Sequence, residues 1–262
     1  MRSRRWVLNS AVLCALGIPP AHNALAASAN ETVERGKEVY NAYCVICHGA
    51  DGDGKGLMGV IHRAQQDGLV VDTYPRDFTA GMFKFRSTPS GSLPTDDDLM
   101  KVVTIGIPRS GMPSHKDVST EDREAVIAYI KTFSPKWVEF EADPPIAVPE
   151  VPDYIGSSES VARGKDAFKL AGCFNCHGAS GQGDGPSASG LKDNWGDKIL
   201  PFDFTSGPLK RGSSPKDVYL TFMTGLDGTP MPSYQESLED QMCWDLVSFC
   251  LELMKGSPTA DR

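Results

Sequence analysis

A five-residue pattern, Cys-x-x-Cys-His, occurs twice in the chain, as CVICH at residues 44–48 and as CFNCH at residues 173–177. The first copy is followed by GADGDG and the second by GASGQGDG, and stretches of this composition form turns. The two patterns use four of the seven cysteines in the chain. Two copies of so specific a pattern predict two equivalent units, each organised around the chemistry of these side chains.

Further blocks repeat in the same order around the two patterns. RGKEVY precedes the first pattern and RGKDAF the second, YPRDFTAG is matched by LPFDFTSG, and GMPS is matched by PMPS. His48 and His177 are 129 positions apart, whereas Met112 and Met231 are 119 apart. The second copy is therefore about ten residues shorter between these points, and the chain is predicted to be a domain duplication.

The first residues have the features of an export signal. Arg2, Arg4 and Arg5 precede an apolar run over residues 6–18, which is too short to span a bilayer. Ala24-Leu25-Ala26 then supplies a small-x-small cleavage pattern. Residues 1–26 are therefore predicted to be a signal peptide cleaved near Ala26, with export by the secretory or the twin-arginine route and a periplasmic mature protein.

The mature chain is predicted to contain two domains, residues 27–134 and 158–262, joined by a proline-rich linker over residues 135–157. The sequence of each domain predicts an all-α fold with long irregular loops rich in glycine and proline. Helices are expected over residues 31–43, 96–104, 158–170 and 215–224, and from caps at Ser119 and Ser237. A domain of about 100 residues with so much irregular chain lacks a sufficient core, so each is expected to enclose a large group.

Two cysteines about one helical turn apart place both sulfurs against the same edge of a porphyrin, and the next histidine reaches the iron. Cys-x-x-Cys-His is the attachment pattern of haem c. A zinc site requires four gathered ligands, and a redox dithiol uses neither the histidine nor a second copy. The sequence therefore predicts two covalent haem c groups, with thioether cysteines and iron-binding histidines as follows: Cys44, Cys47 and His48; Cys173, Cys176 and His177.

The chain resembles the class I c-type cytochromes twice over, from about residue 33 to 133 and from about 160 to 254. The resemblance implies two tandem domains, in each of which the first and last helices cross and a loop brings a methionine to the sixth position of the iron. Met112 in GMPSH and Met231 in PMPSY stand where the family places that ligand. Both haems are therefore expected to have histidine and methionine ligands.

Some assignments stay open at this point. His62 and His115 are further histidines that can replace Met112 at the first haem, whereas the second domain offers no spare histidine. Arg86 and Arg211 occupy matching places in FKFRSTP and LKRGSSP. They are predicted to bind haem propionates through charge-assisted hydrogen bonds, with an exposed surface role as the alternative.

Two further cysteines and one insertion have no assigned role. Cys243 and Cys250 are separated by about 10.5 Å along a helix axis, too far for a mutual disulfide. Cys250 is predicted to be a buried small apolar residue and Cys243 to be more exposed. Residues 57–74 form an insertion that either docks a partner or covers the haem edge.

The composition favours protein partners. The net charge is −8 and becomes about −11 once the signal and its three arginines are removed. This charge disfavours nucleic acid and anionic membranes, and no membrane span is expected in the mature chain. The leading hypothesis is a periplasmic dihaem electron-transfer protein, a soluble carrier or a subunit of a respiratory complex, that serves redox proteins with basic docking surfaces. The alternative is an enzyme, a dihaem peroxidase or sulfur-compound oxidase with one open haem.

Overall fold

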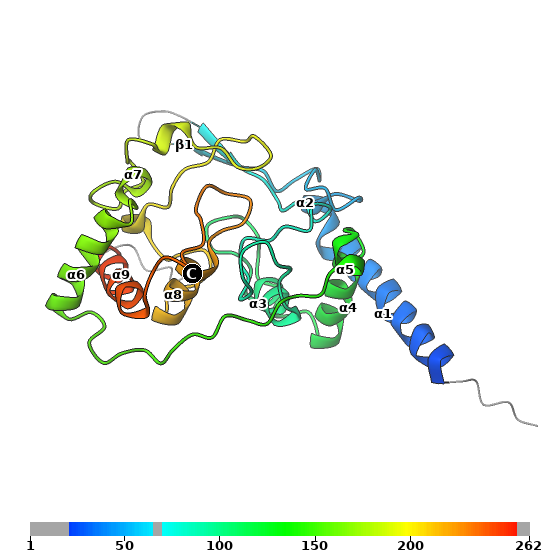
Figure 1. The fold of residues 1–262 in the computed structure, drawn as a ribbon. Coiled ribbons are helices and arrows are strands. Elements are labelled where there is room, and N and C mark those ends of the chain that lie inside the picture. The colour runs from blue at the N-terminus through cyan, green and yellow to red at the C-terminus, as the bar shows by residue number, and fades with distance from the viewer. Residues whose placement is uncertain (1–20, 65–69, 256–262) are drawn as a thin grey trace, which may run out of the picture.

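The computed structural model describes residues 21–64 and 70–255 of the chain (Figure 1). Two helical halves follow each other along the chain, with a short hairpin in the first (Figure 1). The elements of the first half are α1 (Ala21–Tyr43), α2 (Val45–His48), β1 (Ile61–Ala64), β2 (Val70–Thr73), α3 (Asp96–Ile105) and α4 (Thr120–Lys131). After α5 (Lys136–Glu139), the second half contains α6 (Ser158–Leu170), α7 (Phe174–His177), short 3₁₀ helices at Ala188–Gly190 and Phe204–Ser206, α8 (Pro215–Thr224) and α9 (Asp240–Leu253).

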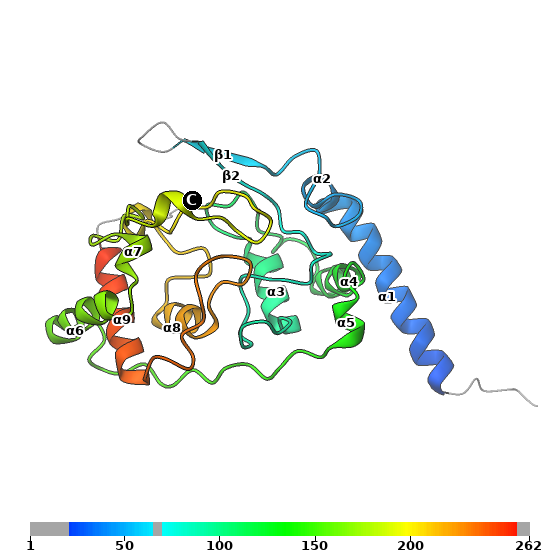
Figure 2. The ribbon, with the colours of Figure 1, turned by 45° about the horizontal axis from the view of Figure 1, so that its top comes forward.

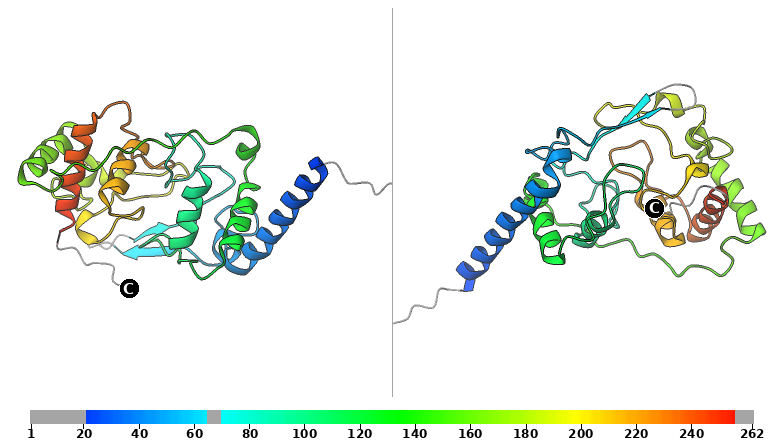
Figure 3. Two further views of the ribbon diagram at one scale, coloured as in Figure 1. Left: turned by 90° about the horizontal axis from the view of Figure 1, so that it is seen from below. Right: turned by 180° about the vertical axis from the view of Figure 1, so that it is seen from behind.

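The same arrangement of helices is present in both halves. The first and last helices pair, α1 with α4 and α6 with α9, and these pairs lie at opposite ends of the molecule (Figures 1 and 3). The third helices, α3 and α8, face the middle, so the two halves meet through their loop-rich sides (Figure 2). This mostly helical, duplicated architecture confirms the predicted all-α fold class.

A glycine at each helix crossing allows the paired helices to approach closely. A Cβ added to Gly36 on α1 would lie 2.0 Å from the carbonyl oxygen of Ala125 on α4. A Cβ added to Gly164 on α6 would lie 1.9 Å from the carbonyl oxygen of Asp245 on α9. No real Cβ can occupy such a position, which explains why glycine follows arginine at the same place in both copies of the repeat.

The predicted helix limits are largely confirmed, with two corrections. Ser119 accepts a hydrogen bond from the backbone N–H of Asp122 and caps α4 as predicted. The cap predicted at Ser237 is wrong, because α9 begins at Asp240 with Glu239 before it. The backbone N–H of Ser237 is held in a turn by the carbonyl of Tyr234, 3.0 Å away, and this turn delays the helix.

α1 is also longer than predicted, since it already includes Ala21, the first described residue, and not only residues from about 31 onward. Residues 1–20 of the predicted signal peptide lie outside the described residues, and cleavage near Ala26 stays a prediction. Within the described part of the chain, no helix combines the length and apolar character required to cross a bilayer.

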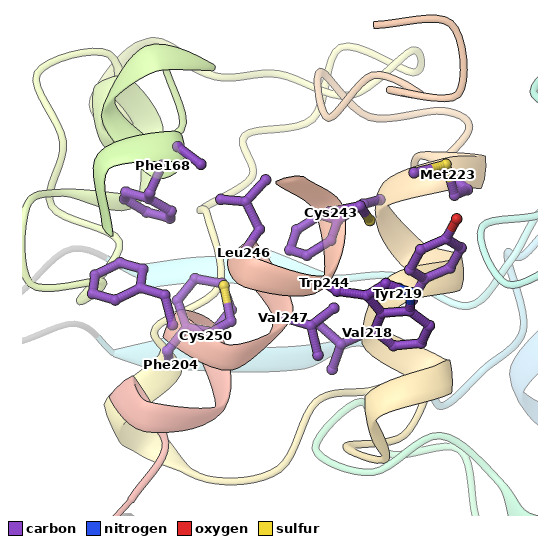
Figure 4. Packing of buried hydrophobic residues seen from close by; sticks show 13 residues of the cluster. Phe168, Phe204, Val218, Tyr219, Met223, Cys243, Trp244, Leu246, Val247 and Cys250 are labelled. Carbon is purple, nitrogen blue, oxygen red and sulfur yellow. The ribbon is translucent and has the colours of Figure 1, made fainter. Parts of the chain in front are cut away.

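α9 is buried on several sides in the core of the second half (Figure 4). It packs against α6 on one side and α8 on another. The ring centres of Trp244 and of Tyr219 on α8 are 4.4 Å apart. Cys250 is buried as predicted, but Cys243 is buried as well, with no exposed surface for either residue. The prediction of a more exposed Cys243 is wrong because α8 covers that face of the helix.

Two connecting segments contain secondary structure that the sequence did not indicate. The insertion after residue 57 contains the antiparallel hairpin of β1 and β2, with Ile61 paired to Thr73, and the hairpin extends toward the second half (Figures 1 and 2). The linker contains one helical turn, α5, despite its prolines. The linker then runs along both halves, and the backbone N–H of Ile146 donates to the carbonyl of Ser87.

Candidate functional site

Each Cys-x-x-Cys-His pattern forms one turn of helix at the end of the first helix of its half. The backbone N–H of His48 donates to the carbonyl of Cys44, and that of His177 to the carbonyl of Cys173, both at 2.9 Å. These bonds wind α2 and α7, so the two cysteines of each pattern lie about a turn apart. The sulfurs can therefore meet one porphyrin edge, as the sequence predicts.

Both histidines are fixed through the same ring nitrogen. Nδ1 of His48 donates to the carbonyl of Arg76, and Nδ1 of His177 donates to the carbonyl of Phe202, each at 3.1 Å. Because a carbonyl can only accept, Nδ1 carries the proton and Nε2 is left with its lone pair. Burial lowers the pKa of both imidazoles, which favours the neutral form that binds metal.

The glycine-rich stretches after the two patterns form matching loops. The backbone N–H of Gly54 donates to the carbonyl of His48 at 3.0 Å, and that of Gly183 to the carbonyl of His177 at 2.9 Å. Gly54 and Gly183 both have a φ of 77°, which favours glycine. The turn interpretation of these stretches therefore accounts for their composition.

The two methionines lie on equivalent turns between the third and last helices. The backbone N–H of Ile107 donates to the carbonyl of Met112, and that of Leu226 to the carbonyl of Met231, each at 3.1 Å. Both methionines are half-buried and line the same cavity as the cysteines and histidines. The geometry brings each methionine to the cavity wall of its own half.

That cavity has a volume of about 1370 Å³ and extends through both halves. Apolar side chains of α3, α8 and the central loops form much of its wall. The predicted haem residues that line it are Cys44, Cys47, His48, Met112, Cys173, Cys176, His177 and Met231. One continuous space between two sets of attachment residues fits two haem groups side by side, which the separate motifs alone do not indicate.

Positively charged side chains in the wall of the cavity are suited to bind the carboxylates of haem. Burial lowers the pKa of Arg76 and of Arg211 to about 10. Burial also lowers the pKa of Lys84 to about 8, and the neighbouring Arg76 adds to this effect. In addition, Nη1 of Arg109 is buried and has no hydrogen-bond partner among the described residues. Cations removed from water are stabilised by anions, and the propionates of haem would supply such anions, so the residues present fit the group.

The two arginines selected from the sequence lie where the halves meet. Arg86 is fully buried, and its Nη2 donates to the carbonyl of Thr224 at 2.8 Å and to Asp227 at 2.9 Å. Arg211 lines the cavity, and it donates to the side chain of Thr224 and to the carbonyl of Arg86. Both arginines join the halves, and their propionate role stays a prediction.

The two histidines that could replace Met112 as an iron ligand have different surroundings. His62 is on β1, where it pairs with Asp72 at 2.6 Å and keeps 69% of its side chain exposed. His115 lines the cavity, and its Nδ1 is buried without a partner in the described part of the chain. His115 is therefore the competitor that lies near Met112, whereas His62 is turned to solvent on the hairpin.

Sequence reasoning missed two residues that cross between the halves. Trp195 of the second half stacks on the guanidinium of Arg76, 4.7 Å from the ring centre, and its Nε1 donates to Asp77 at 3.3 Å. Arg109 of the first half lies 5.1 Å from the ring centre of Phe202. Neither Trp195 nor Arg109 has an equivalent side chain in the other copy, so the repeat alone gives no signal for either.

Comparison with known proteins gives matches in both halves. Residues 31–130 match the family described as cytochrome c oxidase, cbb3-type, subunit III, and residues 161–253 match the family described as cytochrome c. A chain in the structure of the reducing HAO-like protein complex of Kuenenia stuttgartiensis is 42% identical, with a TM-score of 0.76. The match covers 84% of this chain and 96% of that chain. No curated protein matches the chain.

The family matches agree with the duplicated helices and with the two attachment motifs at one cavity. Two cytochrome c domains imply two covalently bound haem c groups, as the sequence predicts. The chain belongs to the class I c-type cytochromes and carries two of their domains in tandem.

Proposed function

We propose that the chain is a periplasmic electron-transfer protein whose two haems are each bound by histidine and methionine. The observation that carries this proposal is the position of His48 and Met112, and of His177 and Met231, in the wall of one cavity. An iron with both axial positions filled offers no site for substrate, and methionine ligation favours a raised reduction potential. Residues held in this way would let a bound haem exchange single electrons, with no further bond made or broken by the protein.

The protein residues have separate tasks in this function. Haem supplies an iron that changes between the ferric and ferrous states. The carbonyls of Arg76 and Phe202 fix the orientation of the histidine rings, and the turns at Ile107 and Leu226 present the methionines. The apolar wall of the cavity would limit the access of water to a bound haem, and little reorganisation would then accompany each electron transfer.

A fixed position in a larger redox complex is the favoured setting. The similar chain of known structure belongs to a complex of HAO-like proteins, which supports assembly with another redox protein. The acidic charge of the chain favours a partner with a basic docking surface, because complementary charges speed association. The proposed role of the chain is to pass electrons to such a partner or to receive electrons from it.

Reaction of the reduced holoprotein with hydrogen peroxide tests the electron-transfer function against peroxidase activity. A peroxidase would transfer two electrons, one from each haem, and with two protons convert one peroxide to two waters. We expect both haems to stay reduced for as long as a single-haem class I cytochrome does under the same anaerobic conditions. Rapid oxidation of both haems by one equivalent of peroxide would contradict the proposed function.

A further inference from the structure

The turn that carries Met112 contains a residue in an unfavourable backbone conformation. Arg109 has a φ of 61°, and it alone has a positive φ among the non-glycine residues of the described chain. In the equivalent turn of the second half this position is Gly228, with a φ of 82°. Glycine adopts this conformation freely, whereas a residue with a Cβ is strained by it. Such strain, at a position where the other copy uses glycine, indicates a role for the Arg109 side chain.

The side chain of Arg109 reaches from its own half into the other. Its guanidinium lies 5.1 Å from the ring centre of Phe202, and the carbonyl of Phe202 accepts from Nδ1 of His177 at 3.1 Å. Arg109 also lines the shared cavity. The turn that presents Met112 in the first half is therefore in contact with the segment that fixes His177 in the second half.

One donor group of this guanidinium lacks an acceptor. Nη1 of Arg109 is buried and has no hydrogen-bond partner among the described residues, which is costly for a charged group. A carboxylate within reach of Nη1 would supply the missing acceptor and balance the charge. A planar guanidinium stacked on an aromatic ring is well oriented for a carboxylate.

We propose that Arg109 binds a carboxylate of the haem held by the second half. The turn of Met112 then contributes to the binding of both haems, because it presents a ligand to one iron and a counter-ion to the other haem. This inference rests on the haem arrangement of the proposed function. It makes the potential of the second haem dependent on a residue of the first domain.

A contact in the opposite direction accompanies this one. Trp195 of the second half covers the guanidinium of Arg76 at 4.7 Å, and the carbonyl of Arg76 accepts from Nδ1 of His48. Each half thus places one side chain on the segment that fixes the histidine of the other. The Arg109 contact is part of a two-way exchange and not an isolated surface contact.

Redox titration of the Arg109→Gly holoprotein, followed by the optical spectrum, tests the proposal. Glycine adopts this turn without strain, so the variant is expected to fold. Met231→His, made in both backgrounds, identifies the second haem through the lowered potential of a bis-histidine iron. Arg109→Lys keeps the charge but removes the planar, stacked donor group.

Loss of a cation beside a haem carboxylate favours the ferric iron. We therefore expect Arg109→Gly to lower the midpoint of the second haem more than that of the first, and Arg109→Lys to restore only part of the difference. An unchanged second-haem midpoint, or a larger shift at the first haem, would overturn the proposal. A wild-type spectrum without methionine-ligated iron would instead count against the proposed function, so the two failures are distinguishable.

Discussion

Arg86 of the first domain and Asp227 of the second form an ion pair with an Nη2–Oδ1 distance of 2.9 Å. The Arg86 side chain is fully buried and that of Asp227 is 14% exposed. Asp227 also accepts from the side chain of Ser90 and from the backbone N–H of Gly91, both in the first domain. The two domains are therefore joined by a buried, hydrogen-bonded charge network at the turn that leads to Met231.

Replacement of Arg86 should destabilise the holoprotein strongly. Arg86→Ala leaves the carboxylate of Asp227 without its buried counter-charge, and breaking such a pair costs about 3–5 kcal/mol. Unfolding by guanidinium chloride gives the free energy of unfolding of each variant and so measures this loss. Lys101→Ala is the matched control, because Lys101 pairs with Asp217 across the same interface but has 51% of its side chain exposed. The control should cost no more than about 1 kcal/mol, and equal losses in the two variants would contradict the account.

The helix crossing at Gly164 gives a second stability prediction. Gly164→Ala forces α6 away from the carbonyl of Asp245, and overpacking of this kind costs about 1–3 kcal/mol or more. Gly190→Ala is the control, because an added Cβ there meets nothing within 4 Å. Thermal unfolding should show a clear loss for Gly164→Ala and little change for Gly190→Ala. A Gly164→Ala protein as stable as the wild type would show that the crossing is not close.

The pair of Asp217 and Lys101 gives the interface a dependence on pH. Burial opposes ionisation of Asp217, but hydrogen bonds from Lys101 and Ser214 outweigh it, so the pKa of this carboxyl lies below its usual value. A carboxyl with a lowered folded-state pKa stabilises the fold above its unfolded pKa of about 3.9. This stabilisation is lost as the pH falls through the folded-state pKa.

Asp217→Asn measures this dependence directly. The difference in unfolding free energy between wild type and variant should be largest above about pH 5 and should shrink below about pH 4. Denaturant titrations at a series of pH values provide the data. A difference that stays constant across this range would mean that ionisation of Asp217 does not contribute to the interface.

Cys243 and Cys250 should be unreactive in the folded protein. Both are fully buried in the core of the second domain, and burial raises the pKa of both thiols, so little thiolate is available to react. Iodoacetamide at mildly alkaline pH, with mass spectrometry, should modify neither cysteine before unfolding and both after it. Modification of Cys243 in the native holoprotein would contradict the observed packing of α8 against α9.

The sequence was sufficient to predict the local structure of each attachment motif. The spacing of Cys44, Cys47 and His48 specifies one turn of helix, and this local geometry is independent of the rest of the fold. The helix caps were predictable where a serine directly precedes the periodic segment, as at Ser119. The cap predicted at Ser237 was wrong because the backbone N–H of Ser237 closes a turn with the carbonyl of Tyr234. The composition of the segment does not indicate this turn.

The relation between the domains was not predictable from the repeat. The contacts that join them use residues without a counterpart in the other copy, among them Trp195, Arg109 and Asp227. Arg86 and Arg211 do occupy matching positions, yet both converge on Thr224 of the second domain. Duplication specifies two similar units, whereas docking depends on where the copies differ, and a single sequence does not reveal which differences meet in space.

The most direct test of the central claim is the optical spectrum of the haem-loaded protein, first oxidised and then reduced under carbon monoxide. If Met112 and Met231 fill the sixth positions of both irons, the oxidised protein shows the weak far-red band of iron bound to a thioether, and carbon monoxide leaves the reduced spectrum unchanged. A high-spin signal or rapid binding of carbon monoxide at either haem would show an open iron. That result would contradict the electron-transfer account and favour an enzyme.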